Sequence, residues 1–309
     1  MISYAQNRED VVLARAFRGQ TAGFYVDVGA AHPTDHSVTK HFYDLGWSGI
    51  NIEPHPEFFR LLRTRRPRDV NLNVGISDRE GVLTFYEHQV LGGSSTFDAD
   101  LAEFYRRDGV DITESEITVT TLSKVLEQHS VDKIDFLKID VEGFEPQVLA
   151  GANLSRYRPR IVVIESIDPR TQEVERDGPT IAGYVATLFD GINRFYVDEE
   201  ETDLALKVGV PANFLDDYVP VEVVKLRQER DKRSADLAAA RVELDDIRSQ
   251  LTVMTTKFER AHVEIGAART AVTETRASLA DARAGLRDAR AEVSALRAVL
   301  VDDVVEEKH

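Results

Sequence analysis

The stretch Phe24-Tyr25-Val26-Asp27-Val28-Gly29-Ala30-Ala31-His32-Pro33 places an apolar run directly before a turn that contains glycine. Its first five residues are aromatic or β-branched apart from one acid, which is typical of a buried strand. Further apolar runs of strand length lie at 49–53, 70–76, 134–140 and 160–165. Amphipathic stretches between several of these runs indicate helices, so the sequence predicts an α/β domain with a doubly wound, mostly parallel sheet. Such sheets bind ligands beyond the carboxyl ends of their strands.

Weaker patterns complete the expected domain. Helices are expected at 9–17, 56–65, 144–154 and 180–189, with a further helical pattern through Val38, Phe42 and Leu45. Short strands are expected at 82–86, 193–197 and 204–209, and residues 90–117 have the composition of a loop. Within this loop, Gly92-Gly93-Ser94-Ser95-Thr96 and the acidic stretch after it form a candidate substrate lid, with an ordinary surface loop as the alternative.

The composition excludes several classes of protein. The chain has 309 residues, no cysteine, and 38 basic against 54 acidic residues, which gives a net charge of −16. The absence of cysteine excludes a disulfide framework, a thiolate metal site and a cysteine nucleophile. The acidic balance argues against a nucleic-acid partner, because phosphate backbones bind basic surfaces.

The sequence also bears on where the protein acts. Its opening residues lack the features of a signal peptide, and no apolar run is long enough to span a membrane. We therefore expect a cytoplasmic protein without a transmembrane segment. A partner that holds it at the inner face of the membrane is a further option.

The composition changes near Pro220, which divides the chain into an expected globular domain at 1–220 and a coiled-coil segment at 221–309. Apolar residues recur every seven positions in this segment (position a), at Leu237, Leu244, Leu251, Phe258, Ile265, Val272, Leu279, Leu286, Val293 and Leu300. Three residues after most of them lies a second, largely alanine, position (d), which begins at Ala240 and ends at Leu296. This period predicts a left-handed coiled coil, and therefore a homo-oligomer.

The alternative is a single amphipathic helix lying on the globular domain. About 75 helical residues would extend on the order of 110 Å, which is far longer than such a domain. Charged residues flank the apolar positions at g and e, and a parallel pair would bring opposite charges together at 236–241, 243–248, 264–269 and 292–297. The number and direction of the helices stay open at this point.

Acidic residues lie where four of the expected strands end, at Asp27, Glu53, Asp140 and Glu165. One such acid is readily explained as a turn or helix cap, but four at one edge of a sheet indicate a ligand site. Glu53 lies 24 residues after Gly29, and a carboxylate at that place accepts hydrogen bonds from the hydroxyls of a ribose. The turn has Ala31 where a dinucleotide site has its second glycine, which disfavours a pyrophosphate and a nicotinamide-dependent dehydrogenase. S-adenosylmethionine fits better, because it has no phosphates and its cationic sulfonium suits an acidic pocket.

Several segments resemble the FkbM family of S-adenosylmethionine-dependent methyltransferases. They are Ser3-Tyr4-Ala5-Gln6 with Glu9-Asp10, the stretch 24–33, Ser37-x-Thr39 with Phe42-Tyr43, and residues 46–54 and 136–145. The resemblance covers about residues 3–210 and none of the coiled coil, and the sequence departs from the family pattern at Val38, where asparagine is expected. It implies a Rossmann-like class I methyltransferase fold. It also implies cofactor contacts by Gln6, Asp27, Gly29, Ser37, Glu53, Ser77 and Asp78, with Glu53 on the ribose and Ser77 and Asp78 near the adenine.

Methyl transfer to a hydroxyl needs an aligned acceptor and a group that takes its proton. Asp140 and Glu165 end neighbouring expected strands and are candidates to share a Mg²⁺ ion, which prefers oxygen ligands and would lower the pKa of a bound hydroxyl. Asp140, Glu142 and His32 are the candidate catalytic residues, the last two as bases. A helix-capping role for Glu142 and a loop-packing role for His32 are the alternatives.

We expect an O-methyltransferase that acts on a hydroxyl, of a sugar in a glycan or glycoconjugate, with the capping of a growing chain as one form of this activity. A methyltransferase followed by a coiled coil is similar in arrangement to enzymes that cap bacterial surface polysaccharides, which makes a glycosyltransferase a candidate partner. The alternative is a catalytically inactive, methyltransferase-like scaffold that recruits partners through its coiled coil. The intact acids at the strand ends favour the enzyme.

Overall fold

The computed structural model describes residues 1–89, 92–167, 170 and 178–306. Contacts within the chain divide it into two compact units, Met1–Leu226 and Arg227–His309. Among the described residues, no helix combines the length and the apolar character needed to cross a membrane.

The first unit is built on a seven-stranded sheet with the strand order β10-β11-β9-β8-β2-β3-β4. Its strands are β2 (Phe24–Val28), β3 (Ser48–Ile52), β4 (Val70–Leu72), β8 (Phe136–Ile139), β9 (Ile161–Glu165), β10 (Tyr184–Phe189) and β11 (Asn193–Asp198). Neighbours from β9 to β4 are parallel, whereas β11 is antiparallel to both β9 and β10. The structure therefore confirms the predicted α/β fold with a mostly parallel sheet, and the strand quoted first, β2, lies between β8 and β3.

Side chains that alternate along these strands face two separate hydrophobic layers. Val26 and Leu137 pack in one layer, and Tyr25 and Phe136 pack in the other. Successive side chains of a strand point to opposite faces, so both faces need cover. The first layer is covered by α5 (Leu122–Gln128), α6 (Glu145–Ala150) and α7 (Leu154–Tyr157), and the second by α1 (Glu9–Ala16), α2 (Lys40–Asp44) and α8 (Thr202–Val208).

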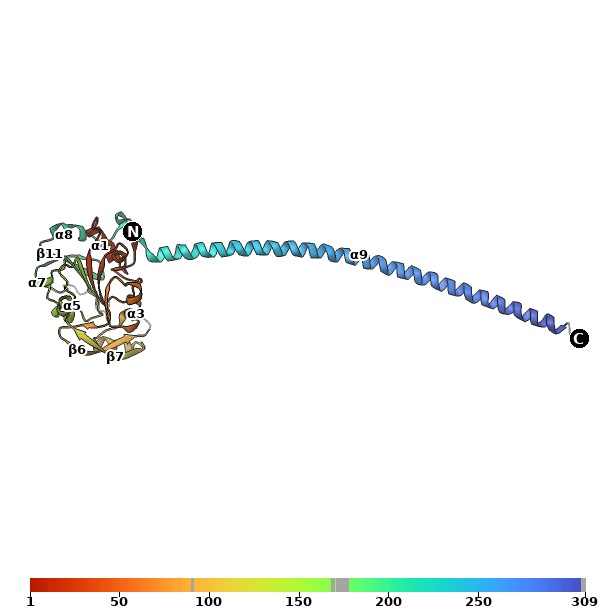
Figure 1. Cartoon of the computed structure of the whole chain (residues 1–309), viewed down its shortest axis with the longest axis horizontal. Coiled ribbons are helices and arrows are strands. Elements are labelled where there is room, and N and C mark those ends of the chain that lie inside the picture. The colour runs from red at the N-terminus through yellow and green to blue at the C-terminus, as the bar shows by residue number, and fades with distance from the viewer. Residues whose placement is uncertain (90–91, 168–169, 171–177, 307–309) are drawn as a thin grey trace. The chain divides into compact units, whose positions relative to one another are not determined.

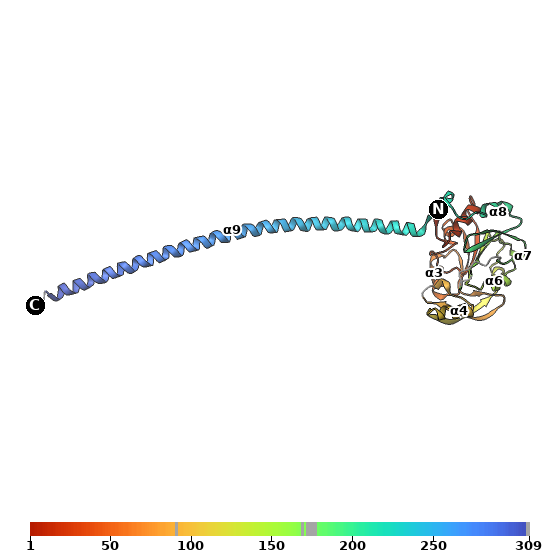
Figure 2. The same cartoon turned by 180° about the vertical axis from the view of Figure 1, so that it is seen from behind.

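The predicted third strand is in fact two. Residues 70–72 form β4 in the main sheet, whereas β5 (Gly75–Ile76) pairs with β7 (Ile112–Thr120) in a separate three-stranded sheet that β6 (Gly81–His88) completes. The break falls at Asn73, whose amide donates to the carbonyls of Glu53 and Pro54 at 2.9 and 2.8 Å. Figures 1 and 2 show this small sheet at the end of the first unit away from α8.

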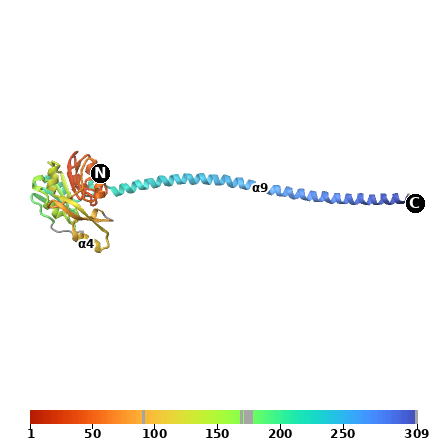
Figure 3. The ribbon, with the colours of Figure 1, turned by 60° about the horizontal axis from the view of Figure 1, so that its bottom comes forward.

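The prediction that residues 90–117 are a loop is wrong. The described part of this segment contains η1 (Gly92–Ser94), α4 (Ala99–Arg107) and much of β7, and α4 lies beside the small sheet (Figure 3). β7 was not predicted because it lacks an apolar run. Most of its residues are partly or fully exposed, and several of them are charged. Thr96, in the predicted lid, forms backbone hydrogen bonds with Tyr86 at 2.8 and 3.1 Å, which fixes that end of the lid to β6. Residues 90 and 91 lie outside the described residues.

Two further predictions near the end of the domain are wrong. Residues 184–189 of the predicted helix 180–189 form the edge strand β10, in which Val185 is exposed. Residues expected as a strand at 204–209 belong to α8. Leu204 and Val208 are buried one helical turn apart while Leu206, between them, is 81% exposed, which is the spacing of a helix and not of a strand.

The predicted helix 144–154 is divided into α6 and α7, the second of which begins with the capping side chain of Asn153.

The second unit belongs to one continuous helix, α9 (Val221–Glu306) (Figures 1 and 2). Its 86 residues span roughly 130 Å at 1.5 Å per residue. The helix follows a short parallel pair between β1 (Ile2–Ser3) and β12 (Val219–Pro220), which joins the two ends of the first unit. A helix of this length with an unbroken seven-residue period is consistent with the predicted coiled coil.

Candidate functional site

Four neighbouring strands carry the predicted acids at one edge of the main sheet. Strands β9, β8, β2 and β3 are adjacent and parallel, so their carboxyl ends lie together. Asp27 is the penultimate residue of β2, and Glu165 is the last residue of β9. Glu53 and Asp140 directly follow β3 and β8.

A buried lysine joins two of these strand ends. Lys138 lies two residues before Asp140 on β8 and is the register partner of Asp27 on β2. Its Nζ is 3.5 Å from Asp27 Oδ1 and 3.1 Å from Asp140 Oδ2, and it donates to the Gly29 carbonyl at 2.8 Å. Burial lowers the pKa of Lys138, but the carboxylates of Asp140 and Asp27 more than offset this and raise it, so the ammonium stays charged. Lys138 thereby ties the loop after β2 to the loop after β8.

Asp27 has one acceptor atom left over. The residue is 1% exposed, and its Oδ2 accepts a hydrogen bond from Thr39 Oγ1 at 3.0 Å. Its Oδ1 accepts no hydrogen bond from the described residues, although Lys138 lies nearby. Burial raises the pKa of Asp27, while Lys138 and Thr39 act in the opposite direction. A buried acceptor without a donor is unusual in a folded protein, and a donor group on a ligand would satisfy it.

Glu53 is held in place by two backbone amides. Its Oε2 accepts from the Ala31 N–H and its Oε1 from the His55 N–H, both at 2.7 Å. The residue is 5% exposed, and burial raises its pKa to about 7 in spite of the two hydrogen bonds. Each carboxylate oxygen can accept more than one hydrogen bond, so the pair of oxygens can still receive two further donors. The geometry of Glu53 therefore suits the two hydroxyls of a ribose.

The turn after β2 approaches the loop after β8 too closely for a side chain. Gly29 has φ +77°, and a Cβ there would lie 1.8 Å from the carbonyl oxygen of Asp140. Glycine is therefore required at position 29 by the close approach of the Asp140 backbone, independently of any ligand. Ala31 also has a positive φ, of 48°, and this places its N–H toward Glu53.

A fully buried arginine, Arg66, holds the loop after β2 through hydrogen bonds. Arg66 donates to the Pro33 carbonyl from Nε at 3.0 Å and from Nη2 at 2.6 Å, and its Nη1 lies 3.8 Å from Asp69 Oδ2. Its Nη2 also donates to Ser37 Oγ at 3.0 Å, and this oxygen lies 3.3 Å from Thr39 Oγ1. The Ser37 hydroxyl thus belongs to a buried network that ends at Asp27, and its predicted contact with a cofactor stays a prediction.

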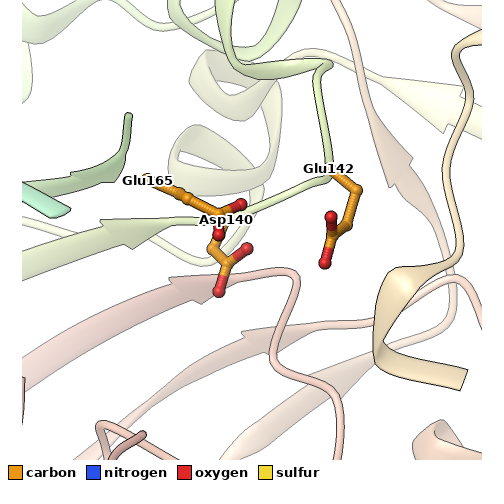
Figure 4. Close-up of side chains that lie close together, drawn as sticks. All are labelled: Asp140, Glu142 and Glu165. Carbon is orange, nitrogen blue, oxygen red and sulfur yellow. The ribbon is translucent and has the colours of Figure 1, made fainter. Parts of the chain in front are cut away.

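Three carboxylates converge at the ends of β8 and β9. Asp140, Glu142 and Glu165 each offer an oxygen that lies within 4.8 Å of the other two (Figure 4). Burial, followed by the charges of Asp140 and Glu145, raises the pKa of Glu142, and burial with the charges of Asp140 and Glu142 raises that of Glu165. The cluster therefore holds protons or attracts cations more strongly than separate surface acids do.

The structure brings other predicted residues less directly into the site. His32 Nδ1 accepts from the backbone N–H groups of Thr34 and Asp35 at 3.3 and 2.9 Å, and burial lowers the pKa of His32. Its Nδ1 therefore organises its own loop, which leaves Nε2 as the nitrogen for any catalytic role. Gln6 is exposed, and the segment around it is attached to the loop after β2 through the bridge between Ala5 and His36.

Ser77 and Asp78 follow β5 of the small sheet. The Ser77 hydroxyl donates to Asp78 Oδ1 at 3.0 Å, and its backbone N–H donates to the Thr120 carbonyl at 2.9 Å. Ser77 is buried, whereas Asp78 is exposed. Their predicted position near an adenine stays a prediction.

The raised pKa values imply that the chain without ligand loses stability as the pH rises from 6.5 to 8.5. Glu53 and Glu145, with pKa values raised by burial to about 7, and the cluster acids bind more protons in the folded state than in the unfolded state over this range. The stability that they contribute is complete below their unfolded pKa and is lost as the pH passes their folded pKa. Histidines with lowered pKa values act in the opposite direction only below about pH 6.5.

We expect a loss of about 2 kcal/mol, which corresponds to a fall in Tm of roughly 5 °C for a domain of this size. Differential scanning calorimetry at the two pH values measures it. A Glu165→Gln variant removes one of the mutually repelling acids and should show a smaller fall. A Tm that rises between pH 6.5 and 8.5 would contradict the buried state of these acids.

The residues that sequence reasoning missed are those that hold the acids in place, above all Lys138 and Arg66. Lys138 could have been found from the sequence, because it is a charged residue inside an otherwise apolar strand. It lies two residues before Asp140, so the two side chains point to the same face of the sheet. Arg66 carried none, since its main partner, the carbonyl of Pro33, lies 33 residues away along the chain.

Comparison with known proteins adds one match. The family model described as the methyltransferase FkbM domain matches residues 27–203, more than half of the chain. The matched segment begins at Asp27 and includes all the acids at the strand ends, while the opening segment with Gln6 lies outside it. No curated protein and no solved structure matches significantly.

Proposed function

Because this chain belongs to the FkbM methyltransferase family, we propose that its first unit transfers the methyl group of S-adenosylmethionine to a hydroxyl oxygen. The observation that carries the proposal is that Glu53, suited to a ribose, and the acid cluster of Asp140, Glu142 and Glu165 follow parallel strands at the same edge of the sheet.

The cofactor pocket is supported by acceptor atoms that can still receive hydrogen bonds. Asp27 Oδ1, which is paired with Lys138 but accepts no hydrogen bond from the described residues, and the remaining acceptor capacity of Glu53 are suited to the donor groups of an adenosyl ligand. When bound, S-adenosylmethionine would supply a methyl group on a cationic sulfur that leaves as a neutral thioether when the methyl group passes to the acceptor oxygen. The chain contributes the position of that ligand and the acidic surroundings that favour its positive charge.

The acid cluster is suited to removing the proton of the acceptor hydroxyl. An acid with a raised pKa is a stronger base once it is deprotonated, so Glu142 is matched to this task better than an exposed glutamate would be. Asp140 is held by Lys138 and is suited to orienting the hydroxyl, and His32 remains a second candidate base through its Nε2.

A divalent cation also fits the cluster. Among the described residues, Lys138 is the only cation paired with these three carboxylates, which leaves them with excess negative charge, and an oxygen-only donor set is the kind that Mg²⁺ prefers. Asp140, Glu142 and Glu165 would hold the ion, which would supply Lewis-acid activation of the acceptor hydroxyl. In the melting experiment above, excess MgCl₂ should then raise the Tm at pH 8.5 for the parent chain and not for Glu165→Gln.

We further propose that the acceptor is a sugar hydroxyl in a glycan or glycoconjugate, and that a glycosyltransferase is a partner where methylation caps a growing chain. The support for this acceptor is the arrangement of the chain, in which a methyltransferase domain is followed by a long heptad-repeat helix, as in enzymes that cap bacterial surface polysaccharides. The alternative function, an inactive scaffold, would need a cofactor pocket that no longer binds its ligand.

The proposed function predicts that the full chain binds S-adenosylmethionine and transfers its labelled methyl group to hydroxyl acceptors. Isothermal titration calorimetry measures the first step, and a panel of monosaccharides, oligosaccharides and lipid-linked sugars tests the second. Transfer to an amine or a carboxylate in preference to every hydroxyl would overturn the O-methylation proposal. Absence of cofactor binding would favour the scaffold.

A further inference from the structure

An uncovered apolar row runs along α9. Its a residues are between 46% and 73% exposed, namely Leu237, Leu244, Leu251, Phe258, Ile265, Val272, Leu279, Leu286 and Val293. Surface leucines are common singly, but a continuous row over eight heptads is a surface that soluble proteins cover. We therefore expect this row to be covered by a partner with a similarly long apolar surface.

The d positions permit another helix to approach closely. Most are alanine, and the one polar member over the described side chains, Thr275, donates its hydroxyl to the carbonyl of Ala271 at 2.8 Å. No charged side chain occupies an a or d position from Leu237 to Leu296, so nothing opposes burial of the row. This face can thus be covered without leaving a polar group unsatisfied.

The small d residues leave holes between the larger a residues. One hollow of about 410 Å³ is lined by Leu286, Ala289, Arg290, Val293 and Ser294. The first four occupy positions a, d, e and a, and a set of four such residues forms the hole that receives a side chain in a coiled coil. The occupant that fits is a side chain from an equivalent helix.

The charges that flank the row select the direction of that helix. Position e carries arginine at 241, 248, 269, 276, 283 and 290, whereas position g carries acids at 236, 243, 264 and 292. Antiparallel helices place e against e and g against g, which would set arginine against arginine and acid against acid. Parallel helices place g against e, which pairs Asp236 with Arg241, Glu243 with Arg248 and Glu264 with Arg269.

We propose that α9 associates with α9 of a second copy of this chain, in parallel and in register. Arg241, Arg269, Glu243 and Glu264 make no ion pair within the described chain, so these charges are available to the second copy. The acids lie five residues before the arginines that they meet, and only an unshifted parallel pairing satisfies all three pairs. In such an assembly the first unit of every copy precedes the same end of the coil.

Distances between spin labels test the direction. The chain has no cysteine, so Ser249→Cys and Ala291→Cys, both exposed and both at position f, can be labelled singly in the full chain. Parallel helices in register place each label opposite its own counterpart, and both distances should fall below roughly 40 Å. In any antiparallel pairing the 42 residues between the sites force at least one distance to roughly 60 Å or more. Equal but long distances would overturn the proposed register.

Matched substitutions test whether the a positions form the contact. Leu251→Asp with Ile265→Asp alters two a residues that are 62% and 54% exposed. Val253→Asp with Val263→Asp introduces the same charges at positions c and f, where the valines are 54% and 71% exposed. Light scattering should find the first variant at the mass of one chain, 34.6 kDa, and the second at the multiple found for the parent. A monomeric parent, or two variants that behave alike, would overturn the proposal.

Discussion

A Glu53→Ala variant is expected to bind S-adenosylmethionine at least about 100-fold more weakly than the parent chain. The variant removes a carboxylate that is placed to accept two hydrogen bonds from ribose hydroxyls, and bonds to a charged acceptor contribute about 1.5–3 kcal/mol each. A 100-fold loss corresponds to about 2.7 kcal/mol, which is slightly less than the smallest sum of the two, about 3 kcal/mol, so 100-fold is a lower bound. Isothermal titration calorimetry at pH 8, where the carboxylate is largely ionised, is the suitable measurement.

The control for this experiment must separate loss of the ligand contact from loss of loop structure, because Glu53 also accepts from the N–H groups of Ala31 and His55. Asp135→Ala is a matched change. Asp135 is 2% exposed and its Oδ2 accepts from the Phe24 N–H at 2.9 Å, but Phe24 begins β2 and so lies at the opposite edge of the sheet. We expect Asp135→Ala to lower the Tm and to leave the affinity within about threefold of the parent. Unchanged affinity in Glu53→Ala would refute the proposed pocket.

The central strands could be predicted because each is buried on both faces. In β2, β3, β8 and β9 most residues are apolar and nearly all are buried, so the run itself indicates the strand, and the parallel direction follows from the helices between the strands. The same reasoning placed Asp140 and Glu165 at one edge before any contact was known. The seven-residue period of α9 likewise spans enough heptads to be read from sequence alone.

Elements with one exposed face were harder to predict. β10 and β7 lie partly in solvent, β7 carries charged residues, and α8 has too few turns to show its period clearly. The supports of the site depend on register: Lys138 meets Asp27 only because β2 and β8 pair without a shift, and a shift of one residue would place the two side chains on opposite faces. Local sequence does not contain that information.

Replacing Glu142 by glutamine is expected to lower the rate of methyl transfer by about 10²- to 10⁴-fold, the usual contribution of a general base. Glu142 occupies the left-handed region at φ 55°, and its carbonyl accepts from Thr96 Oγ1 at 2.7 Å, which fixes the residue at the end of β8. Its carboxyl group lies beside Asp140 and Glu165, and burial raises its pKa above that of an ordinary glutamate. Glutamine keeps the size of the side chain and the backbone hydrogen bond but cannot take a proton.

Two comparisons distinguish a base from a residue that merely shapes the loop. Thr96→Val removes the hydrogen bond to the Glu142 carbonyl and keeps the carboxylate, so its rate should fall by less than about tenfold. With both substrates saturating, so that the titration of Glu53 in the free enzyme does not contribute, the parent's kcat should rise with pH as the Glu142 carboxyl group loses its proton. This limb should disappear in Glu142→Gln while the affinity for S-adenosylmethionine stays within a few-fold. A glutamine variant that retained the parent's rate and pH profile would transfer the role of base to Asp140 or to the free nitrogen of His32.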